Sequence, residues 1–528
     1  MGVRRAVPLF IFKMSSLTAD LLLYGGRVLT LDPHHPEAEA VAIKDGKILA
    51  IGSDGELKSF LASRTQSLSC AGKTVLPGFI DPHLHLFAWA SRFRGVDLSA
   101  ARSIAELQQQ LMAHLSQTRA KDWMRGYGYD EFFLAEKRHP TRHDLDLVSS
   151  DRPLLLRHRT GHAAVLNSAA LHCVGIDQGF QSPEGGSVER DVTGKPTGVM
   201  YEMESFLRKV IPPLAHDDFA AGLKHAGAEL LRQGVTSFHD AGAGNTLEDV
   251  DMFRRLHEGQ VLISRATVMI GSETLPHLIE GGFLPFAGDD HVRLGSVKIM
   301  LHESRGEITP PPEKVIEIVS RAHRQGFQVA MHAVEEGPIC VALEAIARAQ
   351  ANFLRTDHRH RIEHCFLCPP PLVEALVETG SAVVTQPGFL NAYGEKYAAE
   401  IAPDLHEWLY RTKSLLERGI PVAGSSDCPV SPVAPLAGIS AAMSRRSCNG
   451  AVLNKNERLS LFAALSLFTR AGAWIGFEEA QKGRVAPGMM ADLVILDGDI
   501  AQVAPAEMSA MKVQTTIIDG TIVWNTAN

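Results

Sequence analysis

The sequence predicts an α/β protein built on a (β/α)8 TIM-like barrel, with a small β-sandwich formed from both chain ends and an insertion after the first barrel strand. Apolar strand-like runs alternate with helix-like stretches through the middle of the chain, a pattern typical of parallel β/α units. Short strands separated by Gly-Gly and Asp-Gly turns occur toward both ends and indicate antiparallel sheet. The segment between the first two barrel strands is too long for one crossover, so it predicts an insertion.

Length and composition narrow the class of partner. With 528 residues, the chain exceeds a typical domain and predicts a main body with appended units. Its 45% hydrophobic and 21% charged content is that of an ordinary globular protein. A net charge of -8 offers no general attraction to nucleic acid or to an anionic membrane. The expected partner is therefore a small-molecule substrate.

Residues 1–17 are predicted to form a disordered extension, and Met14 is an alternative start. The apolar run at 8–12 is too short for a secretory segment, and Lys13 interrupts it. No window of about 18 uncharged apolar residues occurs, so no membrane-spanning helix is expected. Seven cysteines spread over the chain predict free thiols in a reducing compartment, and we expect a cytoplasmic protein.

Residues 18–77 and 485–528 are predicted to form the sandwich. Its strand-like runs occupy 20–24, 27–31, 40–43, 47–52, 73–76, 491–497 and 513–524. Neither end alone has enough strands to bury two faces, so pairing the two ends is the economical solution.

Residues 78–484 are predicted to form the barrel, with the insertion at about 99–230 covering its mouth. The strand-like runs carry a polar or ionisable residue at or near their ends, and they occupy 79–85, 234–240, 294–300, 327–332, 360–364, 382–386 and 421–427. The carboxyl ends of barrel strands form the catalytic face. These strand-end residues are therefore the candidates for chemistry.

The most informative segment, 76–85, reads as a buried strand that ends in two histidines. Residues i and i+2 of a strand point to the same side, so His83 and His85 can converge on one ion. Later strand ends carry Lys298, His332, His364 and Asp427. Imidazole and carboxylate groups are ligands that zinc and similar divalent ions prefer. Lys298 suits a cation site only when it is deprotonated or converted by carbon dioxide to a carbamate, whose oxygens could bridge two ions.

These motifs resemble the amidohydrolase superfamily, and specifically its YtcJ-like branch, which includes N-substituted formamide deformylases. The matching segments are 76–85, 297–299, 331–333, 360–364, 424–430 and 483–496, with 125–130, 161–168 and 194–198 in the insertion. The resemblance covers nearly the whole chain after about Asp20. Residues 301–310 depart from it, because many relatives have a long Asp-Gly-Ser loop where this chain has a short, differently charged stretch. Substrate preference therefore does not carry over.

The resemblance implies a hydrolase of a non-peptide carbon–nitrogen bond, such as that of an N-substituted amide or formamide. It implies a divalent metal, zinc, as one or two ions bound by His83, His85, His332 and His364. A carboxylated Lys298 would bridge two ions, and Asp427 would serve as ligand and general base, so these two are the expected catalytic residues. Glu363 is a candidate for orienting an imidazole, and the family habit favours a homo-oligomer.

Other assignments stay open at this point. The same metal site could deaminate an amidine-like or ring substrate. A non-catalytic barrel scaffold is a further alternative, although it predicts missing ligands and this chain retains them all. Lys298 could be an ordinary lysine paired with Glu303 or Asp427, and Asp427 could cap a helix.

Three further polar residues, His162, His239 and Gln386, are predicted to bind substrate. His162 lies in a branch-like motif of the insertion, where a structural role is the alternative. His239 ends a strand together with Asp240, and Gln386 also follows a strand. These residues either line the pocket or cap the loops that follow.

Overall fold

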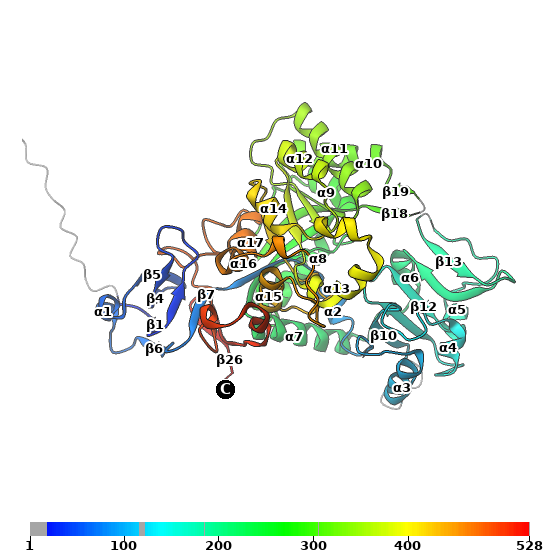
Figure 1. Cartoon of the computed structure of the whole chain (residues 1–528), viewed down its shortest axis with the longest axis horizontal. Helices are drawn as coiled ribbons and strands as arrows, with labels where there is room; N and C mark the ends of the chain where they lie inside the picture. The colour runs from blue at the N-terminus through cyan, green and yellow to red at the C-terminus, as the bar shows by residue number, and fades with distance from the viewer. Residues whose placement is uncertain (1–17, 116–121, 184, 305, 527–528) are drawn as a thin grey trace, which may run out of the picture.

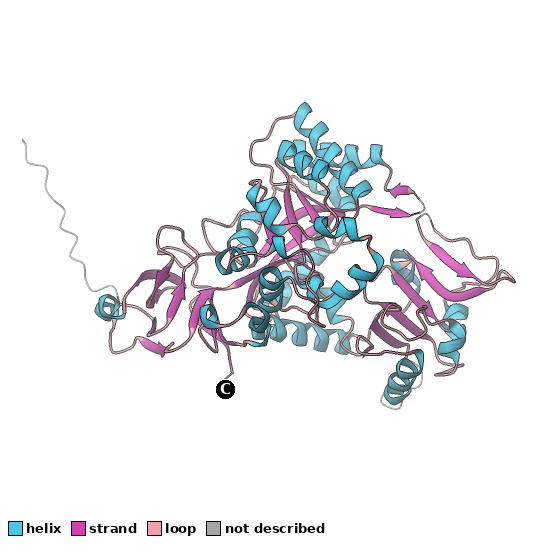
Figure 2. Ribbon diagram, viewed as in Figure 1, coloured by secondary structure: helices cyan, strands magenta, loops and turns pink. Residues whose placement is uncertain are grey.

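The structure, a computed structural model, describes residues 18–115, 122–183, 185–304 and 306–526, and the extension predicted at 1–17 lies outside these residues. Three parts follow one another along the long axis of the molecule (Figure 1). A β-rich part contains both ends of the described chain, the barrel lies in the middle, and the insertion lies beyond the barrel. Figure 2 shows helices gathered around the central strands and a β-rich region at either side.

Two sheets form the part that is built from the chain ends. One has the strand order β5-β4-β1-β6, and the other has the order β26-β25-β24-β7-β2-β3. Their strands are β1 (Leu21–Tyr24), β2 (Arg27–Leu29), β3 (Glu37–Ala38), β4 (Ala40–Lys44), β5 (Lys47–Gly52), β6 (Gln66–Ser69), β7 (Thr74–Pro77), β24 (Leu493–Leu496), β25 (Val513–Ile518) and β26 (Thr521–Asn525). β7 pairs antiparallel with β24, which joins the two ends of the chain. Val41, Val75 and Ile495 share one apolar core, because neither end alone could cover both of its faces.

Eight parallel strands form the barrel sheet, in the order β23-β22-β21-β20-β17-β16-β15-β8. They are β8 (Phe79–Leu84), β15 (Val235–Asp240), β16 (Arg265–Gly271), β17 (Val292–Met300), β20 (Val329–Ala333), β21 (Arg361–His364), β22 (Ala382–Thr385) and β23 (Val422–Gly424). The edges meet where Leu84 bridges Cys428, and the Asp427 amide donates to the His83 carbonyl at 2.9 Å. The predicted fold class is confirmed.

Amphipathic helices cover the barrel. In α10 (Pro312–Arg324), the buried Val315, Val319 and Ala322 recur at helical spacing, and the helix packs against α11 (Glu336–Asn352). The other helices of this part are α2 (Leu86–Ala90), α7 (His216–Arg232), α8 (Leu247–Glu258), α9 (Leu275–Glu280), α12 (Pro370–Thr379), α13 (Gly388–Glu400), α14 (Thr412–Glu417), α15 (Pro435–Ser444), α16 (Leu461–Leu467) and α17 (Arg470–Ile475). α7 begins within the range 99–230 and ends just after it, and its buried face belongs to the barrel core. This packing makes α7 the helix that leads into β15.

The insertion has its own sheet, in the order β13-β14-β12-β11-β10-β9. Its elements are β9 (Val96–Asp97), α3 (Ile104–Leu115), β10 (Met124–Tyr129), α4 (Arg142–Asp146), β11 (Leu154–His158), β12 (Ala163–Leu166), α5 (Ser168–Cys173), β13 (Ser187–Arg190), β14 (Pro196–Tyr201) and α6 (Glu204–Val210). Leu156 and Val165 pack in a core on one face, and Leu155 and Leu166 pack in another on the opposite face. Alternate strand residues point to opposite faces, so both faces are buried.

The short stretch that departs from the family pattern forms a hairpin. Its strands are β18 (His302–Ser304) and β19 (Glu307–Thr309), between β17 and α10. Figure 1 shows the hairpin on the side of the barrel that faces the insertion. A Cβ atom built on Gly185 of the insertion would lie 3.4 Å from His302 Nε2, so the two segments are in contact. Within the described residues, every helix is too short or too polar to cross a membrane.

Candidate metal centre

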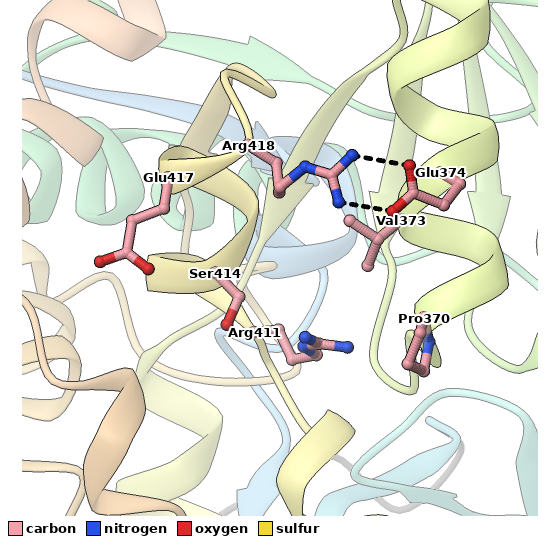
Figure 3. Close-up of a pocket in the computed structure, with 7 residues that line it drawn as sticks. All are labelled: Pro370, Val373, Glu374, Arg411, Ser414, Glu417 and Arg418. Carbon is pink, nitrogen blue, oxygen red and sulfur yellow. Dashed lines mark hydrogen bonds and ion pairs between the residues drawn. The ribbon is translucent and has the colours of Figure 1, made fainter.

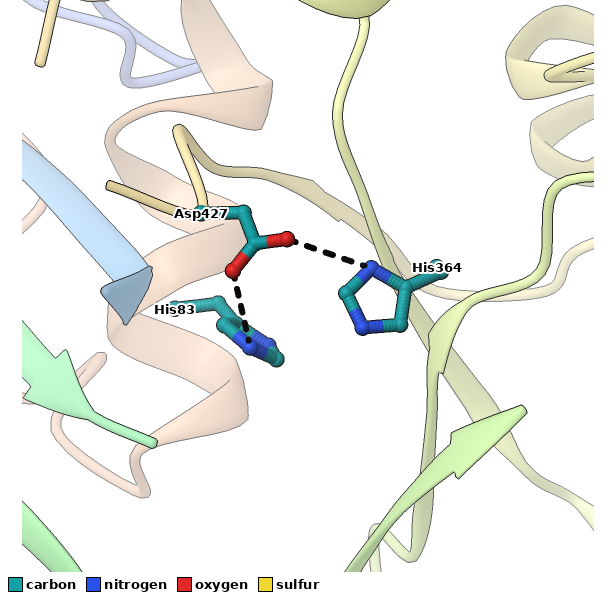
Figure 4. Close-up of side chains that lie close together, drawn as sticks. All are labelled: His83, His364 and Asp427. Atoms are coloured by element: carbon teal, nitrogen blue, oxygen red, sulfur yellow. Dashed lines mark ion pairs between the residues drawn. The ribbon is translucent and has the colours of Figure 1, made fainter. Parts of the chain in front are cut away.

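Three strand-end side chains face one another at the carboxyl face of the barrel (Figure 4). His83 comes from β8, His364 ends β21, and Asp427 follows β23. His83 Nε2 lies 3.5 Å from Asp427 Oδ1, and His364 Nδ1 lies 3.8 Å from Asp427 Oδ2. One possible ligand atom from each of the three falls within 4.8 Å of the others. This is a spacing at which donor atoms can share one ion.

The other residues predicted as ligands surround this group. His85 Nε2 lies 3.3 Å from Asp427 Oδ1. The ring of His332, in β20, lies 4.5 Å from the ring of His364 between centroids. Lys298, in β17, is 1% exposed, and its amine is attracted by the charge of Asp427. Three of the six predicted residues therefore lie within ligand distance of one another, and His85, His332 and Lys298 lie near them in the described structure.

Buried polar groups hold the His83 ring. Its Nδ1 is hydrogen-bonded to Glu363, and Arg361 Nη2 donates to the same carboxylate at 3.1 Å. Arg361 Nη2 also donates to the carbonyl of Pro82 at 2.6 Å, which fixes the backbone next to His83. Because the Nδ1 proton is committed to Glu363, Nε2 is the ring nitrogen presented to an ion.

Gln386 holds the His364 ring in the same way. His364 Nδ1 donates to Gln386 Oε1 at 2.9 Å, and Gln386 Nε2 donates to Ser425 Oγ at 3.0 Å. Among the described residues, the buried His364 Nε2 has no hydrogen-bond partner. His239 and His302 also have a buried Nε2 without a hydrogen-bond partner among the described residues. It is therefore the position of His364 beside His83 and Asp427 that makes its lone pair a candidate metal ligand. The donor set therefore fits a divalent ion.

Burial sets the charge of the ligand group. It lowers the pKa values of His83 and His332 well below their usual range, so both imidazoles are neutral, which is the form that binds a metal. Burial raises the pKa of Asp427, but the hydrogen bond from His85 and the nearby imidazoles outweigh it and hold that pKa below its usual value. Burial lowers the pKa of the Lys298 amine to about 8, despite the carboxylates nearby.

Two of these side chains project from a strained backbone conformation. His364 has φ 73° and Asp427 has φ 55°, both in the left-handed region that residues other than glycine rarely adopt. Such a residue costs roughly 1–3 kcal/mol and persists where its surroundings over-determine it. Thr385 Oγ1 donates to the His364 carbonyl at 2.8 Å, and the Asp427 amide is bonded to the His83 carbonyl. These bonds hold both residues in the strained conformation.

The structure does not bring His239 to the ligand group. Its side chain is buried, and its Nδ1 accepts a hydrogen bond from Arg361 Nη1 at 3.1 Å. Arg361 begins β21 whereas His364 ends it, so His239 lies inside the barrel, below the mouth. Asp240 holds the loops that follow β8 and β15. Its carboxylate accepts hydrogen bonds from the Leu86 amide and from Asn245 Nδ2, each at 2.8 Å.

The structure adds residues that the sequence analysis did not propose for the site. Arg361 is one, and Asp81 is another, whose Oδ1 accepts from the Ser426 amide at 3.1 Å and whose pKa burial raises to about 6. The available signal was the period of two in a strand, which places Asp81 with His83 and Arg361 with Glu363. Glu202 of the insertion, which bonds His162, carried no comparable signal.

All seven cysteines are free. Cys365 and Cys368 do have a Cys-x-x-Cys spacing, and Cys428 lies beside Asp427. All three thiols are buried. The group of possible metal ligands at the barrel mouth contains none of these thiols. Its donor atoms are therefore nitrogen and oxygen.

The surface hollow in Figure 3 is separate from this centre. It has a volume of about 200 Å³ and is lined by Pro370, Val373, Glu374, Arg411, Ser414, Glu417 and Arg418, from α12, α14 and their flanks. Arg418 Nη2 and Glu374 Oε2 pair at 2.6 Å across it. Its lining contains none of the predicted site residues, and this pair already satisfies two of its charges.

The fold is a parallel eight-stranded barrel, and histidines, a lysine and an aspartate lie at the carboxyl face of its strands. The protein is therefore a barrel protein with a candidate metal site. The chain belongs to the Amidohydrolase family, whose sequence model matches residues 67–524. The predicted resemblance to amidohydrolases is confirmed.

Two relatives and one solved structure match nearly the whole chain. Identity is 28% to the protein described as "Putative amidohydrolase YtcJ" of Bacillus subtilis (strain 168), over 95% of this chain and 98% of that protein. Identity is also 28% to the N-substituted formamide deformylase of Arthrobacter pascens, again over 95% of this chain and 98% of that protein. The crystal structure of an uncharacterized metal-dependent hydrolase from Pyrococcus horikoshii OT3 matches with a TM-score of 0.73 and 25% identity, covering 92% of this chain and 99% of that chain.

Proposed function

We propose that this protein hydrolyses a carbon–nitrogen bond other than a peptide bond, in an N-substituted amide or formamide, with zinc as one or two ions. The observation that carries the proposal is the group of His83, His364 and Asp427, in which the buried His364 Nε2 has no partner among the described residues. The similarity to an N-substituted formamide deformylase over 95% of the chain supports the substrate class.

In this proposal, four imidazoles and one carboxylate hold the metal: His83, His85, His332, His364 and Asp427. When bound, a divalent ion lowers the pKa of a water molecule toward neutrality and polarises a substrate carbonyl. Glu363 and Gln386 keep the two most buried imidazoles oriented, so no rearrangement is needed when substrate arrives.

Asp427 moves the proton. Its lowered pKa keeps the carboxylate ionised at neutral pH, so it is ready to accept a proton from the attacking water. The same carboxyl then delivers that proton to the leaving nitrogen, which departs as an amine while the carbonyl carbon becomes a carboxylate. Asp427 lies at the mouth of the barrel within 3.5 Å of His83 and His85, where both transfers are possible.

Lys298 is proposed to carry a carbamate. With a pKa of about 8, roughly a tenth of its amines are neutral at pH 7, against fewer than one in a thousand for an ordinary lysine. The neutral amine attacks carbon dioxide, forming an N–C bond and releasing one proton. The resulting anion would remove the positive charge of Lys298 from the ligand group and would supply oxygen donors to bound metal.

Metal analysis and a substrate panel test the proposal. The zinc-loaded protein is assayed on N-substituted formamides and amides, with carboxylate, amine and ammonia measured separately. We expect carboxylate and amine from the wild type, and about 10²–10⁴-fold lower kcat for Asp427→Asn with zinc retained. Ammonia release from amidine-like or ring substrates alone would replace the proposal with the deaminase alternative. Absence of bound metal would overturn both.

A further inference from the structure

The insertion places a histidine and a glutamate side by side at the barrel mouth. β12 and β14 pair antiparallel with Ala163 opposite Tyr201, so the next residues, His162 and Glu202, meet just beyond the strand ends. The Glu202 amide donates to the His162 carbonyl at 2.9 Å. His162 Nδ1 lies 2.9 Å from Glu202 Oε1 and 3.1 Å from Oε2. The sheet register therefore builds this pair.

The backbone of the pair is strained. Glu202 has φ 53°, and Gly161, directly before His162, has φ 81°. A left-handed glutamate is uncommon, since the conformation is costly for a residue with a Cβ atom. Strained residues of this kind cluster at functional sites, where the surrounding structure holds them. Both segments leave the regular strand pairing at the point where His162 and Glu202 meet.

His162 reaches the metal centre from outside the barrel. Its ring lies 5.8 Å from the ring of His332 between centroids. Its side chain is 40% exposed, whereas the side chain of His364 is 8% exposed. Because Nδ1 is committed to Glu202, Nε2 is the ring nitrogen left for a ligand that enters the mouth.

The pair is not what fastens the insertion to the barrel. That contact includes Arg159, whose guanidinium carbon lies 3.4 Å from the centre of the Tyr393 ring. It also includes Lys396 of α13, whose Nζ lies 3.1 Å from Asp130 Oδ1. Contacts away from the pair therefore already join the insertion to the barrel, and the half-exposed His162 is free to meet a ligand at the mouth.

We propose that His162 binds the substrate through Nε2 next to the scissile carbon–nitrogen bond, and that Glu202 is a positioning residue that acts through His162. The inference rests on the function proposed above and deepens it, because it makes the insertion part of the active site. The insertion then helps to determine which substituent on the substrate nitrogen or carbonyl is accepted.

The test compares three variants of the zinc-loaded full chain. His162→Asn removes the imidazole, and Glu202→Gln keeps an acceptor for Nδ1 but removes the charge. His172→Asn, at an exposed position of α5, is the matched control. We expect kcat/KM to fall about 10- to 100-fold in His162→Asn, by a factor that differs between substrates, and less in Glu202→Gln. Zinc content, circular dichroism and the control should match the wild type.

A second readout does not depend on turnover. Acetohydroxamate chelates zinc and carries an amide-like N–H and carbonyl, so its affinity, measured by titration calorimetry, reports the same contact. We expect it to bind His162→Asn about 10-fold more weakly than the wild type.

The outcomes separate the two proposals. Equal hydroxamate affinity and equal kcat/KM in His162→Asn and wild type would overturn the role of His162 while leaving the hydrolase intact. Loss of zinc or of the circular dichroism signal in His162→Asn and Glu202→Gln would overturn it in favour of a structural role. Weaker hydroxamate binding without turnover of the panel supports the His162 contact and contradicts the proposed reaction. If the wild type binds neither zinc nor acetohydroxamate, both the proposed hydrolysis and the proposed role of His162 are overturned.

Discussion

Replacing Glu363 with glutamine tests whether the orientation of His83 controls the metal centre. The carboxylate is fully buried, bonds His83 Nδ1 and pairs with Arg361. Removing one partner of a buried ion pair costs about 3–5 kcal/mol, because the other charge is left unpaired. Arg361 keeps its bonds to the Pro82 carbonyl and to His239 Nδ1, and glutamine keeps one acceptor oxygen. We therefore expect a loss of unfolding free energy near the lower limit, about 3 kcal/mol.

The same substitution should weaken zinc binding about 10- to 100-fold, the usual effect of losing a group that orients a histidine ligand. Urea unfolding of the metal-free protein measures the first effect, and zinc competition with a chelator measures the second. Glu374→Gln is the matched control, because that glutamate pairs with Arg418 at the surface, where solvent screens the pair and its loss should change stability little. Wild-type zinc affinity in Glu363→Gln would refute the reasoning about His83.

Two further predictions concern other histidines. Gln386→Leu removes the acceptor of the His364 Nδ1 proton, so we expect about 10- to 100-fold weaker zinc binding, measured by the same chelator competition. An unchanged zinc affinity would contradict the orienting role of Gln386. The second prediction concerns acid stability: burial lowers the pKa of His358 to about 4, against about 6.5 in the unfolded chain. The unfolded state then binds more protons than the native state between these values, so stability is greatest above pH 6.5 and falls as the pH drops toward 4, by up to roughly 3 kcal/mol from this residue. Urea midpoints of the metal-free protein at pH 7 and pH 5, for wild type and His358→Asn, measure this contribution. An equal pH dependence in the two proteins would contradict it.

Sequence periodicity was sufficient to predict which end of the barrel carries the candidate metal ligands. A residue at the carboxyl end of a parallel strand must lie on one face of the barrel, whatever its neighbours are. His83, His364 and Asp427 are at or beyond such ends, and the structure brings them together. The strand Arg265–Gly271 was not singled out, because it ends in glycine and carries no ionisable group at its mouth.

The sequence proposed Glu363 as a group that orients an imidazole, but it did not determine which ring each such partner bonds. Gln386 and His239 have the same strand-end pattern, yet Gln386 bonds a candidate ligand and His239 bonds Arg361 inside the barrel. The difference depends on how deep in the barrel each ring lies, which is set by strand stagger and not by spacing along the chain.

By itself, the sequence determined the barrel and the family, and it predicted the strand-end residues His83, His364 and Asp427 that the structure groups together, because strand period and strand ends are local properties. Only the tertiary structure decided that Glu363 and Gln386 orient His83 and His364, and that His162 meets Glu202 over the mouth. The contact between His83 and Glu363 spans 280 residues of chain, and the contact between His162 and Glu202 spans 40. Such contacts form only when strand register and the docking of the insertion place the two segments side by side, and no local pattern records that outcome.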